Sequence, residues 1–429
     1  MTKGNIEQTE IEAPYELPEG WKWCRLGEVV EVLNGYAFKS ENYVHRGIRV
    51  IRITNVQDGY IEDLKPCFYP KEYSNDLSQY TLYENDLLIS LTGNVGRVAL
   101  LPKNFLPAAL NQRVGCLREK NNQISKKYIA YYLRQHKFLS DCIKSSKGTA
   151  QLNMSTEWLK RYPIPLPPTL AEQERIVNRI ESMFSKLDEA KEKALNVVDS
   201  FETRKAAILH QAFTGELTAK WRKENGVSDD SREEKRFDSC IAKMQNGLSK
   251  RSGTDGEETV VLRLANIGEN DFDVSDLRTI KLTPKELENY SLTKNDVVMI
   301  RVNGSKTNVG RQILVKNDDG WSFCDHIIRI TFESFCLPNY MVYFSNTKEY
   351  KDYVEDNMVS SAGQNTISRK GLSNLTLTLP SLPEQQEIVR ILDTVLDKES
   401  RAKEAAQTVL DQIVLLKKSI LARAFRGEL

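Results

Sequence analysis

The sequence predicts an α+β protein with an internal duplication, in which two strand-rich globular domains are joined by two long helices that form an antiparallel coiled coil. The stretch from Leu170 to Leu217 aligns without a gap with Leu382 to Leu429, and 20 of 48 positions are identical. Both stretches carry a heptad pattern of apolar residues, which is typical of a coiled-coil seam. The segments that precede them contain short β-prone runs separated by turn signals, which indicate small mixed domains.

The composition is that of a globular protein with several domains. The 429 residues are 40% hydrophobic and 28% charged, with a net charge of +1. No apolar run approaches the roughly 18 residues of a membrane span, and the polar N-terminal stretch lacks a signal-peptide core. The seven cysteines form no CxxC pair, and there are four histidines. These features argue against a zinc site, a disulfide framework or a membrane partner, and they favour a cytoplasmic location.

Residues 1–168 are predicted to form the first globular domain. Strands are expected within Ile48–Thr54 and Asp86–Thr92, and a helical patch is expected over Lys126–Cys142, where aromatic residues and leucines recur at helical spacing. A proline cluster from Pro163 to Pro168 should then stop regular structure and give an extended approach to the first arm.

The second half is predicted to repeat this layout. Residues 218–236 are polar, highly charged and almost devoid of aliphatic side chains, which indicates a linker or exposed loop. Residues 237–381 then form the second globular domain. Its "NDVVMI" (Asn295–Ile300) matches "NDLLIS" (Asn85–Ser90), and its Asn246-Gly247 matches Asn34-Gly35.

Residues 169–217 and 382–429 are predicted to be two helical arms that pair with each other. About 44 helical residues would span roughly 66 Å. Antiparallel pairing about a point near Leu195 and Asn196 would bring together the two charged seam residues, Arg204 and Glu399. The seam is expected to act by packing alone, without chemistry. Its residues are Ile176, Ile180, Leu187, Val197, Phe201 and Arg204 in the first arm, and Ile388, Leu392, Glu399, Val409, Ile413 and Ile420 in the second.

Enzyme signatures are missing. The sequence has no GxxxxGK[ST], GxGxxG, HExxH or GxSxG motif, and no Asn-Pro-Pro-Tyr motif of an amino-methyltransferase. The chain is therefore predicted to be a binding protein with no catalytic residues, no metal site and no cofactor of its own.

Charge is unevenly distributed. Between Arg97 and Arg161 there are 13 basic and 3 acidic residues, whereas Ile300–Lys370 holds 9 basic and 8 acidic residues. The first excess is compatible with a phosphate-facing surface and equally with a solvated lysine-rich face. The second domain shows no such excess.

Two loops of each domain are candidate DNA readers, because amides and arginines can pair with base edges. Gly93–Arg97 is echoed by Gly304–Arg311, and Lys147–Ser155 is echoed by Ser361–Lys370. The alternative for the first loop is a glycine-bearing hairpin turn, and for the second it is capping of the following helix by Ser155 or Ser368. The candidate contact residues are Asn94, Arg97, Lys147, Gln151 and Asn153 in the first domain, and Ser305, Lys306, Asn308, Arg311, Gln364, Asn365 and Arg369 in the second.

The layout resembles the specificity subunit of type I restriction–modification systems over essentially the full chain. The resemblance rests on "LPEGWKWCRLGEV" (Leu17–Val29) at the start of the first domain, on "PLPPTLAEQERIV" (Pro165–Val177) and "LPSLPEQQEIV" (Leu379–Val389) at the start of the arms, and on the two "GEL" ends. It implies that two target-recognition domains each bind one half of a split, asymmetric site in double-stranded DNA.

The resemblance also implies the partners. The paired arms would act as a ruler and hold two modification subunits, which bind S-adenosylmethionine and methylate adenine. Restriction subunits with ATP-driven motor activity would join them. Two rival functions stay open at this point: a coiled-coil scaffold that binds protein partners rather than specific DNA, and a nuclease or methyltransferase in its own right.

Overall fold

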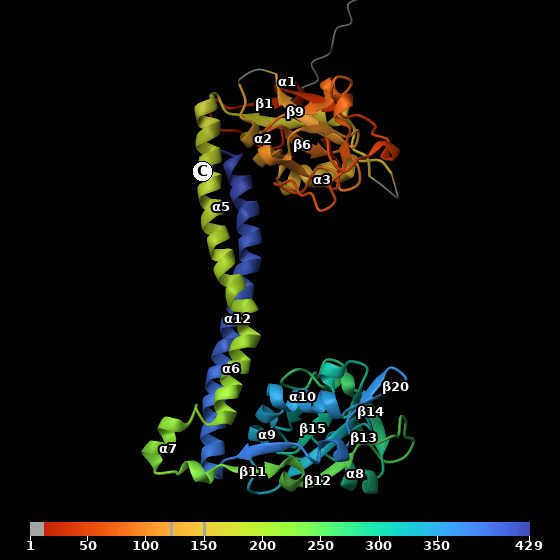
Figure 1. Ribbon diagram of the computed structural model, residues 1–429, viewed down its shortest axis with the longest axis vertical. Coiled ribbons are helices and arrows are strands. Elements are labelled where there is room, and N and C mark those ends of the chain that lie inside the picture. Colours follow the sequence, from red (N-terminus) through yellow and green to blue (C-terminus); the bar gives the residue numbers. More distant parts are fainter. Residues whose placement is uncertain (1–12, 121–122, 149–151) are drawn as a thin grey trace, which may run out of the picture. The chain divides into compact units, whose positions relative to one another are not determined.

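The computed structural model describes residues 13–120, 123–148 and 152–429. The chain divides into two compact units, one made of Met1–Leu195 with Gln407–Leu429, and the other of Asn196–Ala406. Each unit contains one globular domain and one antiparallel pair of helix segments, one from each arm (Figure 1). The division falls at the point about which the arms were predicted to pair.

The first domain is built on two four-stranded sheets and a two-stranded one. The central sheet is wholly antiparallel in the order β2-β9-β6-β7, and the second sheet, β4-β3-β8-β5, includes one parallel pair, β3 with β8. The strands are β1 (Lys22–Arg25), β2 (Val30–Asn34), β3 (Ile48–Ile51), β4 (Phe68–Tyr69), β5 (Thr81–Leu82), β6 (Leu87–Ser90), β7 (Val98–Leu100), β8 (Ala108–Leu110), β9 (Val114–Glu119) and β10 (Pro163–Leu166). The helices are α1 (Leu26–Val29), α2 (Lys126–Leu133), α3 (His136–Ser145) and α4 (Thr156–Arg161).

The second domain repeats this topology. Its central sheet has the order β12-β19-β15-β17, and its second sheet, β14-β13-β18, again contains one parallel pair, β13 with β18. The strands are β11 (Glu233–Arg236), β12 (Ile241–Asn246), β13 (Glu257–Leu262), β14 (Thr279–Leu282), β15 (Val297–Ile300), β16 (Val302–Asn303), β17 (Gln312–Leu314), β18 (Ser322–Phe323), β19 (Ile327–Phe332), β20 (Val359–Ser361), β21 (Gln364–Thr366) and β22 (Thr376–Leu379). The helices are α8 (Pro284–Tyr290), α9 (Pro338–Phe344), α10 (Lys348–Asn357) and α11 (Arg369–Leu372).

The repeated Asn-Asp pair before β6 and β15 has a structural cause. Asn85 and Asn295 both have positive φ (62° and 74°), a conformation that asparagine tolerates better than most residues. The following Asp86 is buried and accepts a hydrogen bond from the backbone N–H of Tyr83 at 2.8 Å; Asp296 does the same for Thr293 at 2.9 Å. The motif therefore shapes the turn that leads into each central strand.

The helical patch predicted over Lys126–Cys142 is confirmed as two helices, α2 and α3, with a break at Arg134-Gln135. Their counterparts are α9 and α10. Ser125 caps α2, since its side chain accepts a hydrogen bond from the Tyr128 backbone N–H. One difference from the sequence expectation is the proline cluster: its first part is the strand β10, which pairs with β1. A proline lacks the N–H that an interior strand needs, but a two-stranded sheet leaves one side of each strand free.

The arms are helical as predicted. The first arm is α5 (Leu170–Asp199) followed after Ser200 by α6 (Phe201–Thr214), and the second is α12 (Leu382–Ala424). Within the second unit, Arg204 Nε lies 2.7 Å from Glu399 Oε2, which confirms the predicted contact and the antiparallel register. Within the first unit, Lys417 pairs with Asp188 at 2.5 Å in the same register.

The seam of the second arm differs from the prediction in its C-terminal half. Ile388, Leu392 and Ile413 are buried as expected, but Val409 is 38% exposed. A straight helix of 3.6 residues per turn drifts by about 20° per heptad from a strict seven-residue repeat. Over the length of α12 this drift turns part of the apolar stripe away from the first arm.

Each globular domain is fastened to an arm by the glutamine of the repeated Glu-Gln pair. Gln173 is fully buried, accepts from the backbone N–H of Ser125 at 2.8 Å and donates to the Gln123 carbonyl at 3.0 Å. Gln385 repeats this geometry with Leu337 at 2.7 Å and Phe335 at 2.9 Å. In each unit the glutamine amide pairs with one backbone N–H and one backbone carbonyl of the globular domain. A glutamine side chain supplies both an acceptor and a donor, which explains why both arms begin with this residue.

A buried tyrosine adds a second link in each unit. The Tyr128 hydroxyl donates to the Pro165 carbonyl at 2.9 Å, and the Tyr340 hydroxyl donates to the Thr378 carbonyl at 3.0 Å. Burial raises the pKa of both phenols, so they stay protonated donors. In the first unit Tyr128 also packs against Phe425, at 5.1 Å between ring centroids, so the last turn of the second arm completes the first domain's core.

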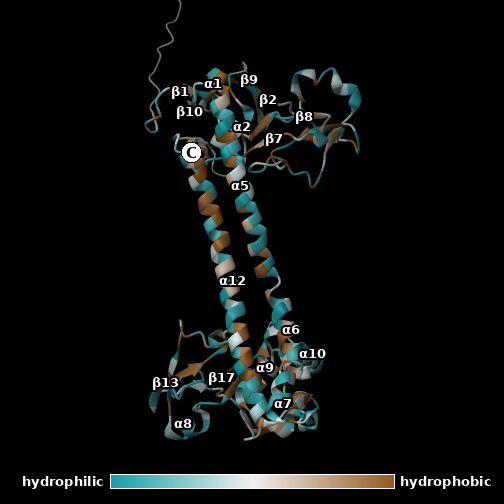
Figure 2. Cartoon of the chain, turned by 90° about the vertical axis from the view of Figure 1, so that its left-hand side faces the viewer, coloured by the Kyte–Doolittle hydropathy of each residue, from teal (hydrophilic) through white to brown (hydrophobic). Residues whose placement is uncertain are grey.

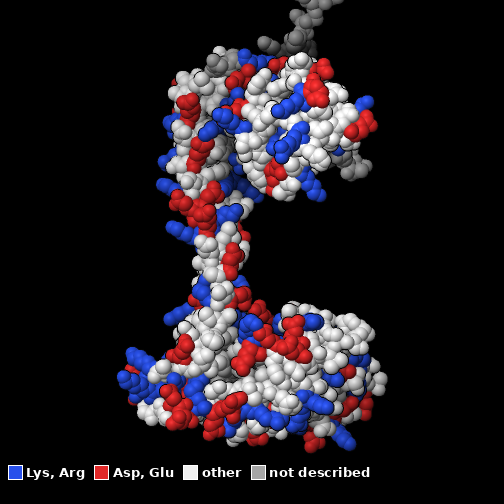
Figure 3. Space-filling model, in the orientation of Figure 1, with Lys and Arg blue, Asp and Glu red and all other residues white. Residues whose placement is uncertain are grey.

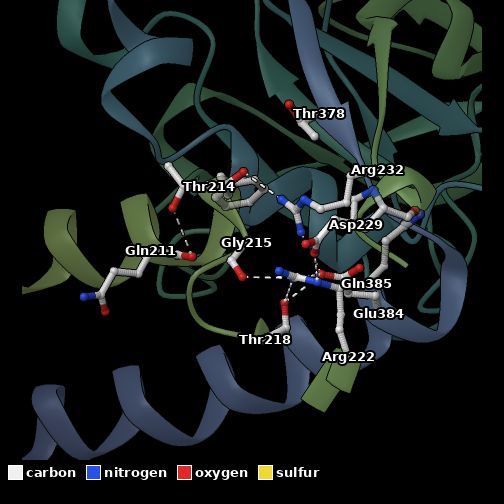
Figure 4. Close-up of polar contacts among 12 residues, drawn as sticks. Gln211, Thr214, Gly215, Thr218, Arg222, Asp229, Arg232, Thr378, Glu384 and Gln385 are labelled. Atoms are coloured by element: carbon white, nitrogen blue, oxygen red, sulfur yellow. Dashed lines mark hydrogen bonds and ion pairs between the residues drawn. The ribbon is translucent and has the colours of Figure 1, made fainter. Parts of the chain in front are cut away.

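The segment 218–236, predicted to be a linker or exposed loop, is instead folded. It contains the helix α7 (Ala219–Asn225) and the strand β11, which pairs with β22. Two of its arginines converge on Glu384, which is 0% exposed: Arg222 Nη1 lies 2.8 Å and Arg232 Nη1 2.7 Å from Glu384 Oε1 (Figure 4). Thr218 donates to the same oxygen at 2.7 Å. A charged segment that looks solvated in sequence is therefore ordered by one buried carboxylate.

Candidate nucleic-acid interface

The two candidate reading loops of the first domain lie side by side at one edge of the central sheet. The Gly93 N–H donates to the Leu152 carbonyl at 2.8 Å, and the Met154 N–H donates to the Leu91 carbonyl at 2.8 Å. The Thr92 hydroxyl lies 3.0 Å from Asn153 Oδ1. Segments some sixty residues apart thus form one polar surface, on which Asn94, Lys147 and Asn153 are exposed. Gln151, also a candidate, lies outside the described residues.

The second domain brings its two loops together in the same way. Strand β16 pairs with β21, and β21 pairs with β20, in a three-stranded sheet. Ser305, Lys306, Gln364 and Arg369 are exposed on this surface, and Lys306 makes one exposed ion pair with Glu355 at 3.5 Å.

Asn365 does not fit its expected role as a DNA contact. It is only 7% exposed, its Nδ2 donates to the Gly304 carbonyl at 3.0 Å, and its Oδ1 accepts from the Ser360 hydroxyl at 2.6 Å. Both ends of the amide are used inside the domain. Asn365 therefore holds the two loops together.

The two loop arginines are also held from within. Arg97 Nη1 donates to Gln57 Oε1 at 2.6 Å, and Arg311 Nη2 donates to Asn308 Oδ1 at 2.7 Å. These contacts fix the loops before any ligand binds, and they agree with the alternative of a shaped hairpin: Gly93–Arg97 connects the antiparallel pair β6 and β7. The capping alternative is confirmed as well. Ser155 accepts from the Glu157 N–H at 3.2 Å, and Ser368 accepts from the Gly371 N–H at 3.1 Å.

A third loop at the same edge was missed from the sequence. In the first domain it is the turn between β8 and β9, where the Leu91 N–H donates to the Arg113 carbonyl at 3.0 Å. In the second it is the turn between β18 and β19, where the Arg301 N–H donates to the His326 carbonyl at 2.8 Å. The signal that could have located it was a polar tripeptide, Asn111-Gln112-Arg113, between two short apolar runs.

The repeated Asn-Gly pair is explained by this third loop. A Cβ on Gly35 would come within 2.3 Å of the Asn111 backbone, and one on Gly247 within 2.3 Å of the Cys324 carbonyl oxygen. Only glycine lets the end of β2 or β12 approach the turn so closely. Asn-Gly is a common signal for a hairpin turn, but here the pair serves a close backbone contact.

Figure 3 shows basic and acidic side chains interspersed on the face of each domain that it presents. Among the described residues, one group has metal-ligand chemistry, namely Cys324, Asp325 and His326. Arg251 Nη2 already lies 2.8 Å from Asp325 Oδ1, and a cation beside the carboxylate opposes metal binding. The arrangement suits hydrogen bonding to a ligand more than metal chemistry.

The sequence matches the family model described as "Type I restriction modification DNA specificity domain" over residues 18–198 and 242–409. The chain belongs to this family. DNA sequence recognition is accordingly its role, and the two matched stretches correspond to the two copies of the duplication.

Individual specificity subunits are similar in sequence to this chain over nearly its full length. The StySPI specificity subunit of Salmonella potsdam is 31% identical over 422 residues, which cover 96% of this chain and 90% of that protein. The EcoKI specificity subunit of Escherichia coli K12 is 27% identical, with the same coverage of 96% and 90%.

Solved structures agree on the fold. The HsdS subunit of Thermoanaerobacter tengcongensis matches with a TM-score of 0.64 at 18% identity, covering 98% of this chain and 100% of that one. A chain from a study of complex assembly and conformational transition in the type I system matches with a TM-score of 0.68 at 19% identity, covering 97% and 100%. Among the described residues, no helix is long and apolar enough to cross a membrane.

Proposed function

We propose that each globular domain reads one half of a bipartite, asymmetric site in double-stranded DNA, while the arms fix the spacing between the halves. The observation that carries this is the contrast within the duplication. The two central sheets share one topology, whereas the loops at their edge present different side chains: Asn94 and Lys147 in one domain, Ser305 and Lys306 in the other. One framework with two sets of exposed polar residues suits two different half-sequences.

The arms are proposed to hold two modification subunits. Besides the seam, α12 carries exposed apolar side chains in its C-terminal half: Val409, Val414, Leu415 and Leu416. Figure 2 shows many hydrophobic residues along this part of α12. A cluster of exposed apolar side chains on a helix is typical of a protein contact, so a partner helix would bury them.

The chemistry is proposed to belong to partner subunits in the cytoplasm. The chain itself would bind neither S-adenosylmethionine nor ATP; modification subunits would bring the first and restriction subunits the second. Incubation of the purified chain with DNA, S-adenosylmethionine and magnesium should give neither methylation nor cleavage. Turnover by the chain alone would contradict this division of labour.

The spacing role can be tested by lengthening both arms by one heptad, at the midpoint of each. Seven helical residues add about 10.5 Å, which corresponds to about three base pairs at 3.4 Å each. Methylation-aware sequencing of a host that makes the variant with its modification subunit should show the same half-sites with a spacer about three base pairs longer. A change in the half-sites with an unchanged spacer would refute the proposal. If the complex with the wild-type chain bound all DNA sequences with equal affinity, the alternative of a coiled-coil scaffold protein would be favoured instead.

A further inference from the structure

Two exposed polar residues interrupt a buried stretch at the sheet edge of each domain. From Ala108 to Leu117 every residue is buried except Gln112 and Arg113. From Ser322 to Ile330 every residue is buried except Asp325 and His326, which are half-exposed. The pattern recurs at the equivalent turn of both domains, where the chain passes from the second sheet to the central sheet. This turn joins β8 to β9 in the first domain and β18 to β19 in the second.

The backbone of the first pair is fixed from both sides. The Gln112 N–H donates to the Tyr36 carbonyl at 3.0 Å, just beyond β2, and the Arg113 carbonyl accepts from the Leu91 N–H at 3.0 Å, just beyond β6. Asn111, which is buried, accepts from the Arg113 N–H through its side chain at 3.2 Å. The turn is thus part of the rigid sheet although its side chains face outward.

The second pair is held by the equivalent contacts. The Asp325 N–H donates to the Leu248 carbonyl at 2.9 Å, and the His326 carbonyl accepts from the Arg301 N–H at 2.8 Å. The two domains therefore present two residues each from the same rigid backbone. Precise placement on strand ends is what base reading requires, because a bidentate contact tolerates little displacement.

The side chains differ in chemistry and in what holds them. Within the described part of the chain, neither the Gln112 amide nor the Arg113 guanidinium has a side-chain partner. In the second domain the Asp325 carboxylate lies 2.8 Å from Arg251 Nη2 and 3.2 Å from His326 Nδ1, so it orients both of them. The Arg251 side chain remains 56% exposed.

We infer that Gln112 and Arg113 read bases for the first domain, that Arg251 and His326 read them for the second, and that Asp325 is a positioning residue. This rests on the proposed function. An amide pairs bidentately with adenine and a guanidinium with guanine in the major groove, while an imidazole offers a single donor or acceptor. The neighbouring exposed residues, among them Lys147 and Arg369, then supply phosphate contacts that set the register.

The test uses the full chain assembled with its modification subunit in a host, with methylation-aware sequencing as the readout. Gln112→Ala/Arg113→Ala should relax discrimination by about 10- to 100-fold at one or two base pairs of one half-site, the range expected for losing bidentate contacts. Arg251→Ala/His326→Ala should relax the other half-site. Asp325→Asn should relax the same positions as Arg251→Ala, to a smaller degree.

The matched control is Lys103→Ala/Asn104→Ala, which removes an exposed cation and an exposed amide at the opposite end of β7. This variant should leave both half-sites and the spacer unchanged. If the Gln112/Arg113 variant also leaves both unchanged, the inference is wrong.

If methylation is lost altogether, binding of the assembled complex to duplexes that differ in one half-site decides the matter. Selective loss for the cognate duplex supports base reading, whereas equal loss for all duplexes indicates phosphate contact and overturns it. Failure of the proposed function would look different, because the complex with the wild-type chain would then methylate no bipartite site at all.

Discussion

Arg204 donates to the carboxylate of Glu399 at 2.7 Å, and this ion pair stands in a seam whose other contacts are mainly apolar. Ser200 accepts a further hydrogen bond from Arg204 at the junction between α5 and α6. A charged pair at one seam position costs some stability but favours a single register, since a shifted arm would place either charge against apolar side chains.

A double-mutant cycle on this pair should give a coupling free energy of about 0.5–1 kcal/mol, because both side chains remain partly exposed. The cycle needs Arg204→Ala, Glu399→Ala and the double variant, each followed by urea unfolding. The exchanged variant, Arg204→Glu/Glu399→Arg, should recover most of the loss. No coupling at all would mean that apolar packing alone sets the register.

Replacing Glu384 by alanine should destabilise the second unit by about 3–5 kcal/mol, because Arg222 and Arg232 would lose their shared buried partner. Limited proteolysis should cut within α7 before it cuts elsewhere. The repeat supplies the control: Glu172 occupies the equivalent place but is only half-buried and pairs with the exposed Arg175, so Glu172→Ala should cost less than about 1 kcal/mol. Equal costs would contradict the assignment.

Gln385→Ala should cost about 2–4 kcal/mol, because it removes a fully buried amide from its backbone partners, the N–H of Leu337 and the carbonyl of Phe335. Gln173→Ala should behave in the same way in the first unit. Thermal unfolding measures both. An unchanged melting temperature for either variant would show that the amide does not fasten the domain to the arm.

Gly35→Ala and Gly247→Ala should each distort the sheet edge, since the added Cβ meets backbone atoms at 2.3 Å. We expect a lower melting temperature and loss of selectivity at one half-site only. Gly304→Ala is the control for stability, because its Cβ would meet nothing closer than the Gly363 carbonyl oxygen at 3.7 Å. If all three variants melt alike, close approach is not the reason for the Asn-Gly motif.

Leu415→Lys/Leu416→Lys should leave the melting temperature of the free chain nearly unchanged, because both side chains are already exposed. It should weaken assembly with the modification subunit, measured by size-exclusion chromatography with light scattering. Thr203→Lys, at the position that the repeat makes equivalent to Leu415, is the control and should assemble normally. Normal assembly of the leucine variant would remove the proposed role of this part of α12.

The arms were predictable because their pattern is periodic and each helix has one principal partner. The same regularity placed Arg204 opposite Glu399 from sequence alone. The prediction failed for Val409, where the drift of a straight helix against the heptad turns the residue outward. The prediction assumed a strict seven-residue repeat, which does not account for this drift.

The folded state of the 218–236 segment could not be predicted, because it depends on a partner far along the chain. Arg222 and Arg232 look like solvated charges until Glu384, some 150 residues later, is placed between them. The third loop of the interface was missed for the opposite reason. Gln112 and Arg113 lie between two apolar runs that predict burial, and only the sheet shows that the chain turns outward there.

The first unit is discontinuous in sequence, since residues 407–429 complete a core that begins near the N-terminus, whereas the second unit is one continuous stretch. During synthesis on the ribosome the second unit can therefore fold before the first, whose core is complete only after Phe425 has emerged. A frameshift or stop codon after residue 406 would leave the second unit intact and remove part of the core of the first, so damage to the codons for residues 407–429 would impair the domain that is translated first.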